Sequence, residues 1–302
     1  MRQAVIGIAD RPLVSRFFHT SPLVRGLVER FVAGETLDEA LVACHELATS
    51  GMALTLDQLG ENVSTQAEVV AATDTYVNVL RRLHQEQLEP NISVKLTMLG
   101  LDLGDDVARD AMRAILGAAR EVGGFVRIDM EGSAYTERTM RLFYELHDAY
   151  PDEVGIVIQT YLHRAEADVR ACIERRARVR LVKGAYAEPA SVAFQRQEEI
   201  DRNYVRLMKL LMDEGRFPAL ATHDPALISA AQDHARRRHI PLDSFEFQML
   251  YGVRQDEQKR LATEGYGMRV YVPFGTEWYA YFSRRIAERP ANALFVLRQL
   301  FG

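Results

Sequence analysis

The chain has 302 residues, of which 48% are hydrophobic and 26% charged, an ordinary composition for a globular protein with a large apolar core. The formal net charge of −5 and the absence of a long lysine and arginine run argue against a nucleic-acid-binding protein. No apolar run reaches the roughly 18 residues that a membrane-spanning helix needs. The only two cysteines, Cys44 and Cys172, are far apart, which is typical of a reducing compartment without disulfides. We therefore expect a cytoplasmic protein.

The N-terminal part of the chain predicts helices. Ser21 is a candidate N-cap for a helix that ends at Gly34. Thr36 opens a second predicted helix, which ends at Gly51, and Glu39 completes a capping-box pattern with Thr36. These two helices predict a helical arm ahead of the repeating part of the chain.

From residue 51 onward, short apolar runs alternate with longer amphipathic segments. Eight runs have strand character: Met52–Asp57, Ile92–Thr97, Phe125–Met130, Gly155–Thr160, Val179–Gly184, Pro218–His223, Phe245–Leu250 and Arg269–Phe274. Six of the intervening segments predict helices: Thr65–Gln85, Asp105–Glu121, Thr136–His147, Ala165–Arg176, Glu188–Glu214 and Pro225–Arg238. Strict alternation of strand and helix implies a parallel sheet.

Eight such units predict an α/β fold, a closed (β/α)₈ barrel of the TIM type. An open, doubly wound sheet is the alternative, but six strands would suffice there. We expect a helical arm over residues 1–50 and one barrel domain over residues 51–302.

Polar residues gather where these strands end, which is where a (β/α)₈ barrel forms its active site. They are Lys95, Thr97, Arg127, Asp129, Glu131, Gln159, Tyr161, Arg180, Lys183, Tyr186, Thr222, His223, Asp224, Glu246, Gln248 and Tyr271. A charge within an apolar run is costly to bury unless it is paired. Lys95 and Asp129 alone are equally consistent with a structural ion pair. The whole collection on one rim favours a ligand site or a reaction.

The segment after the last strand carries two adjacent arginines. Trp278, Tyr281, Arg285 and Glu288 share one face of the predicted helix, with Arg284 beside it. Spacing alone favours a solvated surface helix, because exposed Arg/Glu pairs are common. Its position after the eighth strand favours a clamp for a small carboxylate, which the guanidinium fork matches bidentately.

Several motifs are absent. The chain has no GxxxxGK[ST] phosphate-binding loop and no GxSxG nucleophile turn. After His45, Thr49 stands where a zinc-binding helix needs its second histidine, so we expect no metal site.

Five motifs together resemble the proline dehydrogenase family, the flavin-dependent enzymes that oxidise L-proline. They are ISVKLT (92–97), RLVKGAY (180–186), ATHDP (221–225), FEFQML (245–250) and YVPFG followed by YFSRRIAE (271–288). The likeness runs from Leu56 to Glu288 in chain order, which is more specific than any single motif. It is similar to the short, monofunctional bacterial form. The resemblance implies a distorted (β/α)₈ barrel that holds FAD.

The resemblance also implies roles for individual residues around the substrate. It implies a substrate pocket made by Lys95, Leu250, Tyr271, Tyr281, Arg284, Arg285 and Glu288. The lysine and the two arginines would hold the proline carboxylate, and the two tyrosines and the leucine would wall the ring. Glu288 would orient the arginines or face the substrate nitrogen.

The catalytic and cofactor-binding residues follow from the same resemblance. Asp129 and Arg180 would be catalytic, with Arg180 near the reactive flavin nitrogen and Asp129 tying Lys95 or an arginine in place. The FAD contacts would be Met130, Gln159, Arg180, Lys183, Gly184, Ala185, Thr222 and His223. Gln159 would bond the pyrimidine edge of the flavin. Gly184 suits a close approach of backbone to cofactor.

The implied reaction moves a hydride from the proline ring carbon next to nitrogen to flavin N5. Its product is Δ1-pyrroline-5-carboxylate, and the reaction is the first step of proline catabolism to glutamate. The electrons would pass to a membrane quinone, which implies peripheral contact with the inner membrane.

A second enzyme class fits the strand-end residues without the resemblance. Lys95 or Lys183 at a barrel rim would form a Schiff base, as in class I aldolases. A barrel that only binds a carboxylate is a third reading, which keeps the arginine clamp but needs neither Arg180 nor Gln159.

Overall fold

The computed structural model describes residues 30–60 and 62–278. Eight parallel strands close into a barrel in chain order, each paired with the next and β8 paired with β1. The strands are β1 (Ala53–Gln58), β2 (Asn91–Val94), β3 (Phe125–Ile128), β4 (Val154–Gln159), β5 (Arg178–Val182), β6 (Ala219–Ala221), β7 (Glu246–Leu250) and β8 (Gly267–Phe274). The predicted eight-stranded barrel is confirmed, and the open sheet is excluded.

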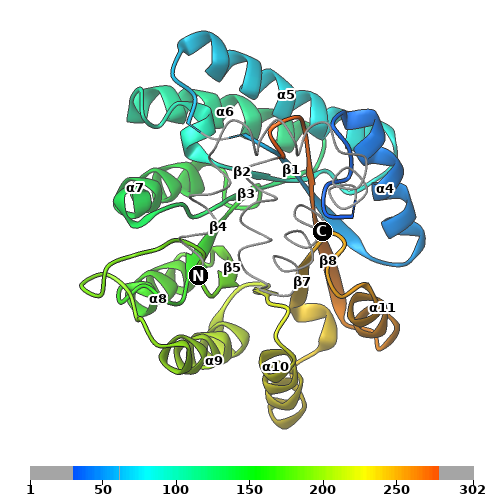
Figure 1. Ribbon diagram of the computed structural model, residues 1–302, viewed down its shortest axis with the longest axis vertical. Helices are drawn as coiled ribbons and strands as arrows, with labels where there is room; N and C mark the ends of the chain where they lie inside the picture. The colour runs from blue at the N-terminus through cyan, green and yellow to red at the C-terminus, as the bar shows by residue number, and fades with distance from the viewer. Residues whose placement is uncertain (1–29, 61, 279–302) are drawn as a thin grey trace, which may run out of the picture.

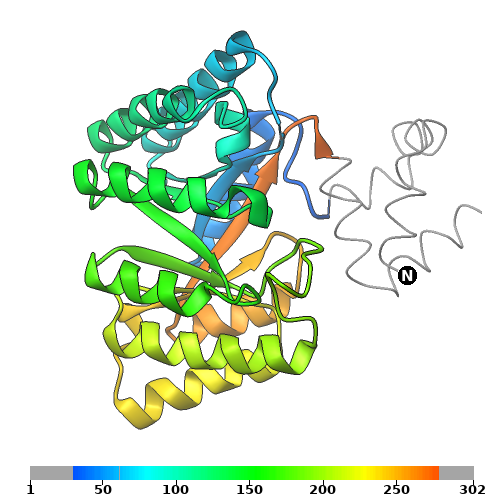
Figure 2. The same cartoon turned by 90° about the vertical axis from the view of Figure 1, so that its left-hand side faces the viewer.

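Helices surround this barrel on the outside (Figures 1 and 2). They are α4 (Leu37–Thr49), α5 (Gln66–Gln85), α6 (Asp105–Glu121), α7 (Ser133–Ala149), α8 (Ala165–Glu174), α9 (Gln197–Glu214), α10 (Pro225–Arg238) and α11 (Gln255–Thr263), with short 3₁₀ helices η1 (Leu96–Leu99) and η2 (Leu242–Ser244). Within the described ranges, none of these helices is long and apolar enough to cross a membrane.

The strands are apolar because helices cover one side and the barrel interior lies on the other. All six residues of β4 are buried, as are all four of β2 and of β3. Strands buried on both faces read as continuous hydrophobic runs, which is why they stand out in the sequence. The helices contribute one apolar face each, such as Leu80 and Leu83 of α5 and Ile115 of α6.

The N-terminal prediction is confirmed in one part and wrong in another. Thr36 caps α4, and both bonds of the capping box with Glu39 are formed. The predicted helix from Ser21 to Gly34 lies mostly outside the described residues, but residues 30–34 are turn and coil. The backbone there bonds β8 instead: Ala33 N donates to Pro273 O at 2.9 Å. The division into an arm and a barrel domain stays a prediction.

The segment after β5 is the largest departure within the barrel. A helix is predicted from Glu188, but α9 begins at Gln197. Residues 192–194 instead pair with the turn after β4, where Phe194 N donates to Tyr161 O at 2.8 Å. The long β5–α9 loop is thereby placed across the C-terminal ends of β4 and β5.

Candidate active site

A cavity of about 760 Å³ opens at the C-terminal ends of the strands. Every described residue to which the family resemblance assigns a role lines it: Lys95, Asp129, Met130, Gln159, Arg180, Lys183, Gly184, Ala185, Thr222, His223, Leu250 and Tyr271. The other predicted residues, Tyr281, Arg284, Arg285 and Glu288, lie outside the described residues. Seven different strands, β2 to β8, therefore bring their ends to one cavity, as the fold class predicts.

Lys95 is held by Asp57, a residue to which the sequence assigned no role. Lys95 directly follows β2, and its Nζ lies 3.0 and 3.1 Å from the two carboxylate oxygens of Asp57 on β1. Both side chains are buried. Burial lowers the pKa of Lys95, but the carboxylates of Asp57 and Asp129 outweigh burial and raise this pKa above its ordinary value. The suggested Lys95–Asp129 ion pair is wrong, and Lys95 is a protonated cation at the cavity wall.

Arg180 on β5 is the centre of the buried polar groups. Its Nη1 donates to Asp129 Oδ1 at 2.8 Å, its Nε to Gln248 Oε1 at 2.5 Å and its Nη2 to Ser93 Oγ at 3.0 Å. The guanidinium also lies 5.3 Å from the centre of the Tyr271 ring. Asp129 thus ties an arginine in place rather than Lys95.

Tyr271 completes the surroundings of Asp129. Its hydroxyl donates to Asp129 Oδ2 at 2.8 Å, so the two carboxylate oxygens have different donors. Burial raises the pKa of Tyr271 well above its ordinary value, and the charges of Asp129 and Asp57 raise it further. The hydroxyl therefore remains neutral and acts as a fixed donor.

Gln159 carries a buried acceptor that faces no donor in the described part of the chain. Its Nε2 donates to the Met130 carbonyl at 3.0 Å, which fixes the amide and leaves Oε1 without a partner there. A buried acceptor without a partner is costly. This side chain lines the cavity, so a bound ligand with an N–H group would satisfy it.

The loop after β5 brings its backbone close to the cavity. Gly184 has φ +116°, and a Cβ built there would lie 2.3 Å from Cδ1 of the buried Tyr161 ring. Before it, Lys183 bonds the carboxylates of Asp201 at 2.6 Å and Asp224 at 2.9 Å. Burial lowers the pKa of Lys183, but these hydrogen bonds outweigh burial and raise it.

Replacing Gly184 by alanine should therefore destabilise the protein. We expect a loss of about 1–3 kcal/mol from the backbone conformation and a similar loss from the clash with Tyr161, measured by urea unfolding. Gly51→Ala is the matched control, because Gly51 also has positive φ but has no atom within 4 Å of a built Cβ. Equal losses in the two variants would contradict the close packing at Gly184.

Hydrogen bonds join the ends of β6 and β7 beside the cavity. The Leu250 backbone N–H donates to His223 Nε2 at 3.0 Å, which places the hydrogen of a neutral imidazole on Nδ1. Asp224 N donates to Thr222 Oγ1 at 3.1 Å. Arg254 holds the His223 carbonyl at 2.6 Å. These contacts fix the predicted wall residue Leu250 relative to the predicted FAD contact His223.

Three residues that bond Lys95 or Arg180 have no predicted role: Asp57, Ser93 and Gln248. Asp57 and Gln248 were visible as polar residues at strand ends, and alternation along each strand could have placed them inside the barrel. Ser93 gives no such signal, because a small hydroxyl in an apolar strand is unremarkable.

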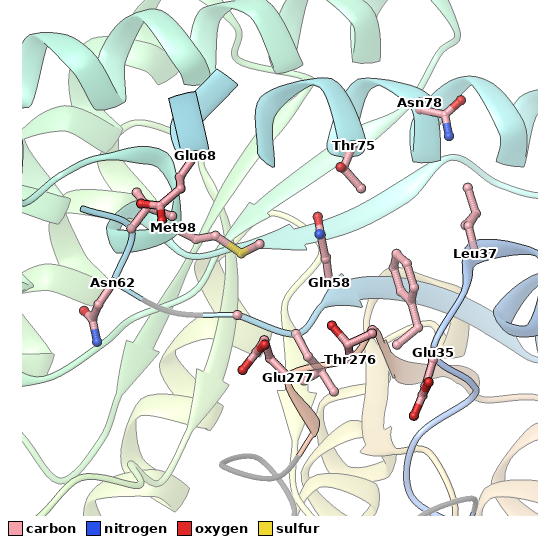
Figure 3. A pocket seen from close by; sticks show the side chains of 15 residues that line it. Glu35, Leu37, Gln58, Asn62, Glu68, Thr75, Asn78, Met98, Thr276 and Glu277 are labelled. Atoms are coloured by element: carbon pink, nitrogen blue, oxygen red, sulfur yellow. The ribbon is translucent and has the colours of Figure 1, made fainter. Parts of the chain in front are cut away.

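A second cavity, of about 440 Å³, lies beside the first strand (Figure 3). Its described lining includes the carboxylates of Glu35, Glu68 and Glu277 around Gln58 and Met98, and no lysine or arginine. None of the predicted site residues lines it. A carboxylate ligand would be repelled here, so the cavity at the strand ends is the candidate active site.

Comparisons with known proteins identify the family of this chain. The sequence model of the family described as Proline dehydrogenase matches residues 40–298. Proline dehydrogenase 1 of Bacillus subtilis is 42% identical over 269 residues, 89% of each chain. Proline dehydrogenase of Deinococcus radiodurans is 40% identical over 301 residues, 98% of this chain and 96% of that protein. The crystal structure of proline utilization A from Bdellovibrio bacteriovorus superposes with a TM-score of 0.81 at 29% identity, covering 87% of this chain and 32% of that longer one. The chain belongs to the proline dehydrogenase family.

Proposed function

We propose that this enzyme oxidises L-proline to Δ1-pyrroline-5-carboxylate with FAD as cofactor, the first step of proline catabolism to glutamate. The observation that carries the proposal is Arg180, a buried cation that lines the cavity at the strand ends and is held there by Asp129, Gln248 and Ser93. When bound, the flavin would supply the chemistry by accepting the hydride at N5. The protein would supply binding, orientation and electrostatics.

The cavity has features that fit such a cofactor. Its volume of about 760 Å³ lies within the usual range for ligand sites. The Oε1 of Gln159, which has no partner among the described residues, suits the N–H of a pyrimidine ring. The tight backbone at Gly184 lets a flat ring approach the chain. The residues that would hold FAD are Met130, Gln159, Arg180, Lys183, Gly184, Ala185, Thr222 and His223.

Lys95 would bind the substrate carboxylate. Asp57 fixes its ammonium and keeps it charged, and a charge-assisted bond in a dry cavity is strong. Tyr271 and Leu250 would wall the proline ring. Arg284, Arg285, Tyr281 and Glu288 would complete this pocket, a proposal that rests on the sequence resemblance. Asp129 would hold Arg180 and Tyr271 in place beneath the substrate.

The protonation of the two lysines weighs against the Schiff-base reading. A lysine nucleophile must lose its proton, and enzymes achieve this by lowering its pKa. Carboxylate partners raise the pKa of both Lys95 and Lys183 instead. Either lysine is therefore suited to hold an anion rather than to attack a carbonyl.

The electron acceptor in this proposal is a membrane quinone, reached by peripheral contact of a cytoplasmic enzyme with the inner membrane. Its support is the family resemblance. A short-chain ubiquinone analogue should reoxidise the proline-reduced protein at a rate that keeps pace with turnover. Reoxidation by the analogue far slower than turnover with an artificial dye would contradict a quinone acceptor.

The visible absorption spectrum of the purified protein tests the central proposal. We expect a yellow protein that bleaches on anaerobic addition of L-proline and yields a product that o-aminobenzaldehyde traps. A colourless protein that gains no flavin on reconstitution with FAD would overturn the proposal. Irreversible trapping of a carbonyl substrate by borohydride would instead support the Schiff-base reading, with Lys95 or Lys183 as nucleophile.

A further inference from the structure

A line of buried polar side chains runs inward from Arg180 through the barrel. Arg180 Nε donates to Gln248 Oε1 at 2.5 Å, and Gln248 Nε2 donates to Glu246 Oε1 at 2.5 Å. Arg269 Nε lies 3.0 and 3.1 Å from the two oxygens of Glu246, and its Nη1 and Nη2 each donate to a carboxylate oxygen of Glu89 at 3.0 Å. Gln248 and Glu246 are two residues apart on β7, so both point into the barrel.

The chemistry of this line fixes the amide of Gln248. A guanidinium only donates hydrogen bonds and a carboxylate only accepts them, so the amide oxygen must face Arg180 and the amide nitrogen must face Glu246. Gln248 and Glu246 are each 3% exposed, so water does not compete for these bonds. Glu246 thereby determines which way the acceptor of Gln248 points.

Gln248 supplies the third fixed point of the Arg180 fork. Asp129 and Ser93 hold the two terminal nitrogens, and two points define only an axis about which the group can tilt. The bond from Nε to Gln248 defines the plane. A guanidinium has five N–H donors, and within the described residues three of them have partners. The plane therefore decides where the other two donors point.

We propose that Gln248, oriented by Glu246, is a positioning residue for the oxidation of proline. It holds the guanidinium plane of Arg180 so that the two remaining donors face the reacting groups in the cavity. This inference rests on the proposed function, because it assigns Arg180 to the flavin side of the reaction. Misplacing a catalytic group by about 1 Å costs on the order of 10²-fold in rate.

The test uses the FAD-loaded enzyme and its Gln248→Leu variant. We expect the rate constant of flavin reduction at saturating L-proline, measured by anaerobic stopped flow, to fall about 10²-fold. The KM for proline should stay within about threefold, because Lys95 and Asp57 are untouched. The midpoint potential of the bound flavin should become more negative, since the cation is no longer held in place. FAD affinity, measured by fluorescence titration of the apoprotein, should change less than about tenfold.

Two further variants separate positioning from stability. Thr65→Ala removes the N-cap of α5, which does not line the cavity, at a cost of about 1 kcal/mol, and should leave flavin reduction unchanged. Gln248→Glu keeps an acceptor for Arg180 but places a second carboxylate beside Glu246. If Gln248→Leu does not fold, Gln248→Glu takes its place in the test. Adding Glu246→Gln to Gln248→Glu removes that repulsion and should recover most of the rate.

The outcomes are distinct. Suppose that proline bleaches the wild-type enzyme, and that the rate constant of flavin reduction and the midpoint potential are unchanged in the Gln248 variants. This result would overturn the positioning role and leave the proposed function standing. An unchanged reduction rate with FAD affinity lost more than tenfold would likewise overturn it, because Gln248 would then serve binding alone. A wild-type protein that proline does not bleach would overturn the proposed function and this inference with it.

Discussion

Replacing Arg180 by methionine is expected to lower kcat/KM for L-proline by about 10³-fold. Arg180 is the buried cation that faces the cavity, and removing one preorganised electrostatic donor costs on the order of 10²–10³ in rate. Its loss also frees Asp129, Gln248 and Ser93 to move. Steady-state kinetics on the FAD-loaded variant measure the effect.

A loss of stability must be separated from this loss of rate. Methionine leaves the Asp129 carboxylate, 16% exposed, without its cation, and an uncompensated buried charge is destabilising. The double variant R180M/D129N removes that charge, so it should unfold at a higher urea concentration than R180M. Its activity should remain as low as that of R180M. Recovery of activity in the double variant would show that Arg180 acts only through stability.

Arg180→Lys is the conservative comparison. Lysine keeps the positive charge but cannot reach Asp129, Gln248 and Ser93 with one rigid fork. We expect a rate between those of the wild type and R180M. A lysine variant with wild-type activity would mean that charge alone matters and that the orientation of the fork does not.

Replacing Arg269 by methionine should lower the free energy of unfolding by about 3–5 kcal/mol at pH 7. Arg269 is 4% exposed and bonds both oxygens of Glu246, which is itself buried in the barrel. It also donates to the Leu54 carbonyl at 2.6 Å. In the variant the buried Glu246 carboxylate and the Leu54 carbonyl lose the hydrogen-bond donors that Arg269 supplies. Urea unfolding followed by circular dichroism measures the change.

The cost should depend on pH in a defined direction. Burial raises the pKa of Glu246, but Arg269 outweighs burial and holds this pKa below its ordinary value of 4.5. In the wild type the stability from Glu246 is therefore complete above pH 4.5 and is lost as pH falls through the lowered pKa. In the variant Arg269 no longer offsets burial, so the pKa of Glu246 rises and its protonation relieves the buried charge at a higher pH. The difference in free energy of unfolding between the wild type and R269M should be largest at pH 7 and should decrease as the pH is lowered.

A surface ion pair provides the matched control. Arg170 bonds Glu166 one turn away on α8, with 56% of the arginine side chain exposed. Arg170→Met should cost only about 0–1 kcal/mol. A cost for R269M within that range, or one that does not change between pH 7 and pH 4, would contradict a buried, charge-dependent role for Arg269.

The barrel could be predicted from the sequence because its strands are buried on both faces. Runs such as residues 155–160 and 245–250 are continuous and apolar, and the helices between them show a period of about 3.6 residues. Strand ends then located the cavity, since all parallel strands end on the same rim. The confirmed gathering of Lys95, Gln159 and Arg180 follows from that topology alone.

The partners within the cavity could not be predicted in the same way. Which carboxylate meets Lys95 depends on the stagger between neighbouring strands: Asp57 on β1 lies in register with Ser93 of β2, two residues before Lys95. Asp129 lies after β3 and bonds Arg180 instead.

The start of α9 was missed because Phe194 and its neighbours pair with the turn after β4. This contact joins segments about 30 residues apart, which local helix propensity does not report.

The pairing of β1 with β8 has a consequence for how the protein is made. Six residue pairs, from Ala53 with Arg269 to Gln58 with Phe274, join the first strand to the last. At about 5–20 residues per second, β1 emerges from the ribosome on the order of ten seconds or more before its partner exists. During that time the growing sheet has two open edges, which are templates for aggregation. A nascent chain that stops short of β8 never closes them, so translation to the last strand, rather than formation of any single helix, commits this protein to its closed barrel.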